Sequence, residues 1–130
     1  PINGTSQYIE SVFRKLDAIL VNQLQGFEKE ENNPRAYEIV QELVTLYTRI
    51  FGDEHAKTLN RKMQKADLLS TMSNYEEAEI ILREVVAGLE ASIGSEAPET
   101  RNAVSKLSSV LLKTGKEEEA GMLMMDSIKA

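Results

Sequence analysis

The chain has 130 residues, enough for one domain, and its 5% aromatic content and three prolines favour packed helices over a turn-rich β protein. The formal net charge of −6 argues against a nucleic-acid partner, and the absence of cysteine excludes a disulfide framework and a thiolate metal site. No apolar run approaches the roughly 20 residues of a membrane span, and no signal peptide is visible. We therefore expect a cytoplasmic protein without membrane contact. Pro1 is not an initiator residue, which is consistent with a fragment of a longer chain.

The first two helices are predicted from apolar residues that recur at intervals of three and four. The first helix runs from about residue 7 into the stretch "EKEENN", and Gly26 near its end indicates an early stop or a weak point. The second helix begins at Pro34, with Asn33 as its N-cap. Gly52 ends it, because glycine accepts a left-handed backbone conformation without a steric clash.

The third helix extends over about residues 56–72, and the fourth begins after Asn74. Glu77 stands three residues beyond Asn74, where its carboxylate can complete a capping box. Gly94 then ends the fourth helix, in the same way as the glycine that ends the second. Both helices carry an apolar stripe on one face, so we expect them to pack as a pair.

The fifth helix opens at Pro98 and closes at Gly115, and the sixth runs from about Glu117. Because the connections are two to five residues long, neighbouring helices must lie antiparallel. The predicted fold is therefore all-α, in a single domain over residues 1–130. Its three helix hairpins cover about residues 7–51, 56–93 and 98–129.

A repeat of 42 residues runs through the chain. The segments 32–52, 74–94 and 116–130 align with one another, and they share a small residue at one position: Ala36, Ala78 and Ala120. One hairpin cannot bury both of its faces alone. We therefore expect adjacent hairpins to stack into an array.

The links between the helix hairpins carry a recurring sequence motif. Residues 52–58 read "GDEHAKT" and residues 94–100 read "GSEAPET", and together they contain every letter of the pattern G-x-E-H-P-x-T. Residues 73–79 read "SNYEEAE" and are predicted to form the turn that joins the third helix to the fourth. In these motifs the chain resembles the tetratricopeptide repeat (TPR) family, specifically the roughly 42-residue repeats of kinesin light chains. The resemblance covers about residues 34–130.

The resemblance implies a right-handed α–α superhelix without a cofactor. Its A helices, the first of each hairpin, would line a concave surface that binds a protein or peptide. The family pattern Leu-Asn-Asn-Leu-Ala is replaced here by "KMQKA" at residues 62–66 and "VSKLS" at residues 104–108. The asparagines with which that family holds peptide backbones are therefore missing at these positions.

No catalytic or metal-binding pattern is visible. His55 is the only histidine, and it stands in the link phrase where the family carries histidine for structural reasons. The glutamates at 76–77 and 117–119 fall in predicted first helical turns, where they face the positive end of the helix dipole. The glycine motifs of nucleotide-binding proteins are missing as well. We therefore expect a protein that is not an enzyme and holds no metal or cofactor.

The charges divide between the two kinds of helix. The third helix has four basic side chains against one acidic, and the fifth has three against one, whereas the fourth has five acidic against one basic. If the A helices line the concave surface, that surface is relatively basic and favours an acidic partner segment. The alternative is that these charges are solvated and keep the chain soluble, while lysine stems cover the core.

The resemblance places the partner-binding residues on the A helices. On the third and fifth helices they are Asn60, Arg61, Gln64, Asp67, Thr71, Asn102, Ser105, Lys106, Ser109 and Lys113. The matching positions on the first helix are Ala18, Val21 and Gln25.

The sixth helix has apolar residues around more than one face. Three interpretations remain open: further repeats follow in a longer chain, the helix is a homodimer contact, or it is an adaptable methionine-rich binding surface. The alternative function is therefore a structural or assembly module that self-associates through its terminal helices. The residues expected to contribute are Met122, Met125 and Ile128.

Overall fold

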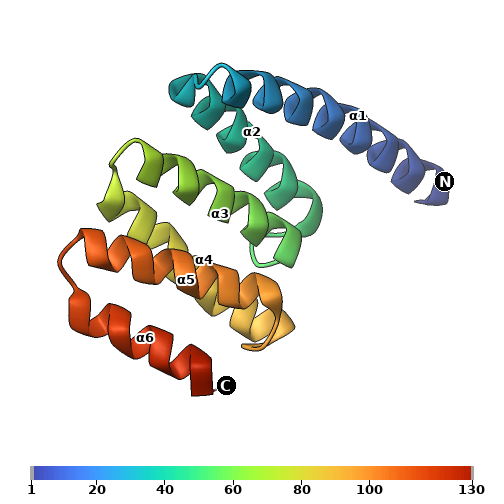
Figure 1. The fold of residues 1–130 in the computed structure, drawn as a ribbon. Coiled ribbons are helices and arrows are strands. Elements are labelled where there is room, and N and C mark those ends of the chain that lie inside the picture. Colours follow the sequence, from blue (N-terminus) through green and yellow to red (C-terminus); the bar gives the residue numbers. More distant parts are fainter. Residues whose placement is uncertain (1, 130) are drawn as a thin grey trace.

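The computed structural model describes the backbone of residues 2–129 and the side chains of residues 6–126. This part of the chain forms six helices and no strand, as predicted. The helices are α1 (Ile2–Lys29), α2 (Asn33–Phe51), α3 (Ala56–Thr71), α4 (Tyr75–Ile93), α5 (Pro98–Lys113) and α6 (Glu117–Lys129) (Figure 1). None of these helices combines the length and the apolar composition needed to cross a membrane.

The boundaries of α1 and α2 differ slightly from those predicted. Gly26 neither ends nor breaks α1, which continues to Lys29, so that prediction is wrong. A glycine inside a helix costs only about 1 kcal/mol, and the packing of the fully buried Leu24 against α2 offsets it. The N-cap of α2 is Asn32 rather than Asn33, and its side-chain oxygen accepts a hydrogen bond from the Arg35 backbone N–H at 3.4 Å.

The starts of α3 and α4 are built differently. At α3, the Nδ1 atom of His55 accepts a hydrogen bond from the Lys57 backbone N–H at 3.0 Å, and the imidazole stacks on the ring of Phe51. At α4, the backbone N–H of Asn74 donates to the Leu69 carbonyl at 2.7 Å. That N–H is already occupied, so the predicted capping box does not form.

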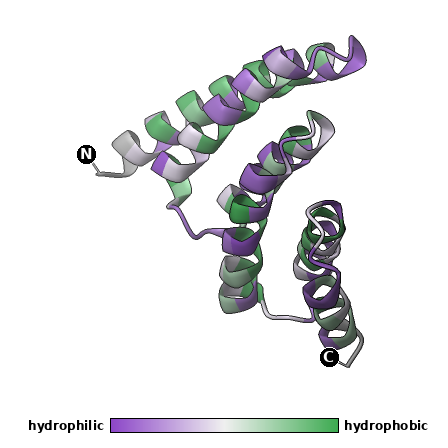
Figure 2. Ribbon diagram, turned by 90° about the vertical axis from the view of Figure 1, so that its left-hand side faces the viewer, coloured by the Kyte–Doolittle hydropathy of each residue, from purple (hydrophilic) through white to green (hydrophobic). Residues whose placement is uncertain are grey.

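The six helices pair into three antiparallel hairpins, which follow one another in Figure 2. Each hairpin also contacts the next, through α2 with α3 and through α4 with α5. Two groups of buried side chains form the core, one shared by α1, α2 and α3 and the other by α3 to α6. Leu68 of α3 belongs to the first group, so the second hairpin is anchored in the core of the first.

Residues 42 positions apart occupy equivalent places in the three hairpins. Ala36, Ala78 and Ala120 are all buried, which explains why the position is small in each copy. The next equivalent set is Val40, Leu82 and Met124. Val40 and Leu82 are 0% and 1% exposed beneath the following hairpin, whereas Met124 in the last hairpin is 43% exposed. The following hairpin is what buries this position.

Two buried threonines link each hairpin to the one before it. The Thr58 hydroxyl donates a hydrogen bond to the Tyr47 carbonyl at 3.2 Å, and the Thr100 hydroxyl donates to the Gly94 carbonyl at 2.7 Å. Both threonines are at most 1% exposed. The acceptors lie near the end of α2 and at the C-cap of α4, where the Gly94 carbonyl also accepts from the Ala97 N–H at 3.4 Å.

Candidate functional site

The exposed sides of α1, α3 and α5 form a surface that we call the A-helix surface. A hollow of about 470 Å³ lies on it between α3 and α5, and we call this the α3–α5 hollow. Seven of the ten predicted contact residues line this hollow: Asp67, Thr71, Asn102, Ser105, Lys106, Ser109 and Lys113. The buried side chains of Leu82 and Val110 also contribute to the lining. Polar side chains from two helices therefore meet over an apolar base.

A second hollow, of about 650 Å³, adjoins the first because Asp67 and Thr71 line both. Gln64 lies here, and Glu28 and Glu31 give the opposite side an acidic character. The structure thus connects Gln64 to the seven residues of the α3–α5 hollow.

The remaining two predicted residues of α3 line a separate hollow, although the Arg61 guanidinium donates a hydrogen bond to Gln64 Oε1 at 2.9 Å. Asn60 and Arg61 line a smaller hollow of about 310 Å³, together with Asp17 and Tyr47. The matching positions on α1 are not alike either. Ala18 and Gln25 are exposed, whereas Val21 packs against the core of the first hairpin and is not free to line the surface.

Two of the predicted cations are already paired within the protein. The Nζ atom of Lys106 lies 2.9 Å from both carboxylate oxygens of Asp67, which links α5 to α3. The guanidinium of Arg61 donates to the Tyr47 hydroxyl at 3.0 Å and lies 3.6 Å from the Asp17 carboxylate. Burial, together with the hydrogen bond that its hydroxyl donates to Asp17, raises the pKa of Tyr47. These contacts reduce the charge available to a ligand.

A third cation of α3 does not belong to the surface at all. Lys62 is buried, and its ammonium donates to Asp53 at 2.7 Å and to Glu84 at 2.6 Å. Burial alone would lower the pKa of Lys62, but the two hydrogen bonds outweigh it and raise the pKa. Lys62 therefore ties the turn before α3 to α4. Counting it toward a basic binding surface was wrong, because a helix charge count does not show which way a side chain faces.

Lys113 at the end of α5 differs from these paired cations. Its side chain is exposed in the α3–α5 hollow, and it forms no ion pair within the described residues. The A-helix surface therefore has mixed charge, with an open cation at the α5 end and acidic Glu28 and Glu31 at the α1 end. This differs from the basic surface that we expected from the helix composition.

The methionines of α6 lie on the outside of the stack. Met122 and Met125 are 66% and 59% exposed, and the residue equivalent to Met122 in the second hairpin, Ile80, is 68% exposed. The side chain of Ile128 lies outside the described residues. Met124 occupies the position that is buried by the following hairpin in the first two hairpins, at Val40 and Leu82. The sequence analysis did not include Met124 among the self-association residues. Its alignment with two buried residues 42 and 84 positions earlier was the signal.

Within the described residues, no group of three or more His, Asp or Glu side chains is placed to hold a metal ion. What these residues do present is a row of amide, hydroxyl and charged groups along two adjacent helices. Such a row can form hydrogen bonds with a polypeptide segment.

Comparison with known proteins identifies the fold. No protein-family model and no curated protein sequence matches the chain. Among solved structures, a Podosopora anserina protein provisionally described as a kinesin light chain with nearly identical TPR-like repeats superposes with a TM-score of 0.70 at 16% identity. The match covers 95% of this chain and 67% of that one, and a point variant of the same protein gives a TM-score of 0.71. The fold is TPR-like.

This likeness confirms the predicted all-α, right-handed stack of three hairpins. In TPR terms, α1, α3 and α5 are the A helices, and α2, α4 and α6 are the B helices. The TPR-like fold therefore presents the A-helix surface as one continuous side of the stack, with the α3–α5 hollow on it.

Proposed function

We propose that this chain is a non-enzymatic protein-interaction scaffold, located in the cytoplasm, which binds a segment of a partner protein on the concave A-helix surface. The TPR-like fold supports this proposal at the level of architecture, because stacked helix hairpins create extended binding surfaces. The α3–α5 hollow is the main observation in its favour. It gathers side chains of Asn102, Ser105 and Ser109 that can bond to a peptide backbone.

In this proposal, the partner segment carries at least one acidic side chain, which lies near Lys113. Lys113 is an exposed cation without an ion pair within the described residues, and Lys106 lies in the same hollow. A carboxylate beside Lys113 gains from its unpaired ammonium, whereas the Lys106 ammonium is already paired with Asp67. Toward α1 the acidic side chains of Glu28 and Glu31 oppose a second carboxylate. The expected ligand is therefore acidic at one end only.

Peptide binding to the intact chain tests this proposal. We would measure, by fluorescence anisotropy, the affinities of length-matched acidic, neutral and basic peptide pools and of the best single peptides selected from them. Lys113→Glu should weaken an acidic peptide by about fivefold to tenfold, because it replaces an attraction between partly exposed charges by a repulsion. The loss should also diminish as salt is raised.

The matched control is Arg35→Glu, which reverses an exposed cation on α2, outside the residues that line the hollow. It changes the net charge by the same amount, so it separates local contact from general charge. Equal affinity for acidic and basic peptides, or equal effects of the two substitutions, would contradict an acidic ligand in the α3–α5 hollow. Absence of any saturable peptide binding would contradict the scaffold function itself.

Self-association through the terminal helices is a second candidate function. The observation that favours it is the exposure of large apolar side chains at both ends of the stack, including Met122 and Met125 on α6. If α6 forms the contact, Met125→Glu should convert a dimer into a monomer. A dimer that persists in this variant would place the contact elsewhere.

A further inference from the structure

An exposed apolar stripe runs along α1. Tyr8, Val12, Leu16 and Ile19 follow one another at intervals of four, four and three, so they share one face of the helix. All four are exposed, Leu16 by 44% and Ile19 by 55%. Single exposed apolar residues are ordinary on a protein surface, but a row of four along one helix face is typical of a docking surface.

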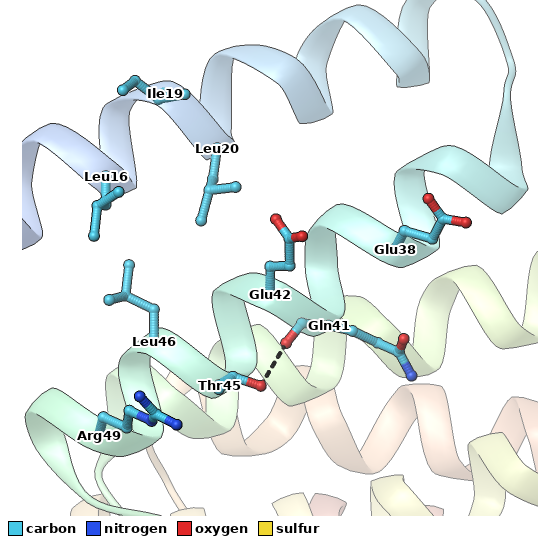
Figure 3. Close-up of a pocket in the computed structure, with 9 residues that line it drawn as sticks. All are labelled: Leu16, Ile19, Leu20, Glu38, Gln41, Glu42, Thr45, Leu46 and Arg49. Atoms are coloured by element: carbon cyan, nitrogen blue, oxygen red, sulfur yellow. Dashed lines mark hydrogen bonds between the residues drawn. The ribbon is translucent and has the colours of Figure 1, made fainter.

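The stripe continues into a hollow between α1 and α2 of about 610 Å³. Leu16, Ile19 and Leu20 line it from α1, and Leu46 faces them from α2 (Figure 3). We call the stripe and this hollow together the N-terminal face. Because it lies on the outer side of the first hairpin, no other helix within residues 2–129 packs over it.

The residue types on the N-terminal face differ from those at equivalent positions inside the stack. Leu16 stands where α3 has Thr58 and α5 has Thr100. Each of those threonines is buried and donates a hydrogen bond to a carbonyl of the preceding hairpin or turn. Leucine cannot donate such a bond. The first hairpin is therefore suited to an apolar cover and lacks the group that joins a TPR-like hairpin to the one before it.

Charged side chains lie at the two ends of the hollow. Glu38 lies toward the N-terminal end of α2, Glu42 near its middle and Arg49 toward its C-terminal end, with Leu46 between Glu42 and Arg49 (Figure 3). Within the described residues none of the three forms an ion pair. A two-fold axis through the middle of the hollow would bring Arg49 of one copy opposite the glutamates of the other, and this contact would occur twice.

We propose that a second copy of this chain docks on the N-terminal face with two-fold symmetry. Leu16, Ile19 and Leu46 form the centre of the contact, and Arg49 pairs with Glu38 and Glu42 of the second copy. The 28-residue α1 is about 42 Å long, and the stripe follows it along the outer side of the first hairpin. This proposal goes beyond peptide binding and is independent of it, since the N-terminal face and the α3–α5 hollow share no residue.

Molar mass in solution is the first test. We would measure it by light scattering and sedimentation over about 1–300 μM, the range in which interfaces of modest size associate. The expected result is a monomer–dimer equilibrium that stops at two chains. Ile19→Glu should raise the dimer dissociation constant by at least about tenfold, because it buries a charge at the centre of the contact. The fold should be unchanged, since Ile19 is exposed in the monomer.

A matched control and a charge exchange give the test its specificity. Ile80→Glu places the same substitution at an exposed site on α4 and should leave the dimer intact. Arg49→Glu and Glu42→Arg should each weaken the dimer about fivefold, and the double variant should regain most of that loss. The two positions are two helical turns apart within one chain, too far to pair with each other, so rescue requires a contact between copies.

Four outcomes would overturn the proposal. The wild-type chain could remain a monomer throughout, or it could keep growing beyond a dimer, as head-to-tail stacking would make it do. The dimer could be disrupted by Met125→Glu and unaffected by Ile19→Glu, which would place the contact on α6. Lastly, the chain could stay monomeric and use Ile19 to bind a synthetic amphipathic helix, which would assign the face to a different protein. A peptide that binds the α3–α5 hollow should bind Ile19→Glu normally, so the two proposals can fail separately.

Discussion

The first and second hairpins share one backbone plan but differ at equivalent side chains that join the two helices of a hairpin or contact the preceding hairpin. In the second hairpin, α4 has Gly88, and the Leu59 side chain lies so close that a Cβ atom there would be 2.7 Å from a Leu59 methyl carbon. The equivalent residue of the first hairpin is Leu46, which lines an open hollow. Likewise Leu20 stands where the second hairpin has the buried, ion-paired Lys62.

This comparison teaches that a position in a TPR-like stack is defined by its neighbours as well as by its place in the repeat. In the second hairpin, Gly88 makes room for Leu59 of the same hairpin, and Lys62 pairs with Glu84 of α4 and with Asp53 of the preceding turn. Thr58 bonds to a carbonyl of α2 in the first hairpin. On the first hairpin the same places hold leucines, which suit an apolar contact. Substitutions at equivalent positions should therefore have unequal effects, and the following predictions run from the largest difference to the smallest.

Truncating equivalent apolar side chains in two hairpins should give the largest difference in the free energy of unfolding. Leu82→Ala should lower the free energy of unfolding by about 3 kcal/mol, because it leaves a cavity in the core shared by α3 to α6. Met124→Ala, its equivalent, should cost less than about 1 kcal/mol, because Met124 is already half-exposed. Urea unfolding followed by circular dichroism would measure both. Similar losses would mean that Met124 is buried in solution by a contact absent from the isolated chain.

Two glycines inside helices should respond in opposite directions. Gly26→Ala in α1 should stabilise the chain by about 1 kcal/mol, because nothing lies within 4 Å of the new methyl group and alanine favours the helix. Gly88→Ala gains the same helix preference but pushes against the buried Leu59, so we expect a net loss of about 1 kcal/mol. Thermal unfolding would show the two signs. Stabilisation by Gly88→Ala would mean that Leu59 repacks freely.

The threonine links should matter inside the stack only. Thr100→Val keeps the shape of the side chain but leaves the Gly94 carbonyl with only the longer hydrogen bond from the Ala97 N–H at 3.4 Å, and should cost about 1 kcal/mol. Leu16→Thr, at the equivalent exposed position, should change the free energy of unfolding by less than about 0.5 kcal/mol. It should nevertheless weaken the dimer proposed above. A stability loss in Leu16→Thr as large as that in Thr100→Val would contradict the distinction between the two positions.

A smaller effect is expected from the contacts that join the second and third hairpins. The hydrogen bond from Lys116, and then that from Arg83, holds the pKa of Glu79 below its ordinary value despite burial. A carboxyl with a lowered folded-state pKa stabilises the fold above its unfolded pKa of about 4.3 and loses this contribution as the pH falls through the folded value. The stability difference between wild type and Glu79→Gln should therefore shrink below about pH 4.5. A difference that does not change between pH 7 and pH 3 would contradict this role.

The fold was accessible from the sequence because its signals are local and repeated. The apolar spacing, the glycines after the second and fourth helices and Pro98 predicted the six helices to within a few residues, except that α1 begins five residues earlier. The prediction from Gly26 was wrong because the low helix propensity of glycine is a weak effect compared with the packing of α1 on α2. The capping box at Asn74 failed because a carbonyl from the previous helix had already taken its N–H group.

Only part of the candidate site could be predicted from the sequence. The resemblance to the repeat family implied five partner-facing residues on α5, and all five line the α3–α5 hollow. It could not predict that Asp67 would pair with Lys106 across two helices or that Lys62 would turn inward, since both depend on distances between segments far apart in the chain. The N-terminal face was missed because the apolar residues of the first helix, at intervals of three and four, were interpreted only as the signal of a helix that packs on its neighbour. Only the structure shows what lies opposite them.

The threonine links have a direction. Thr58 and Thr100 both bond to carbonyl groups that precede them in the chain, and Leu68 packs into a core formed mostly by earlier residues. During translation, each acceptor carbonyl therefore leaves the ribosome before the threonine hydroxyl that donates to it. During synthesis a new hairpin can dock on a surface that is already complete, so the stack can grow in the order of translation without waiting for downstream residues.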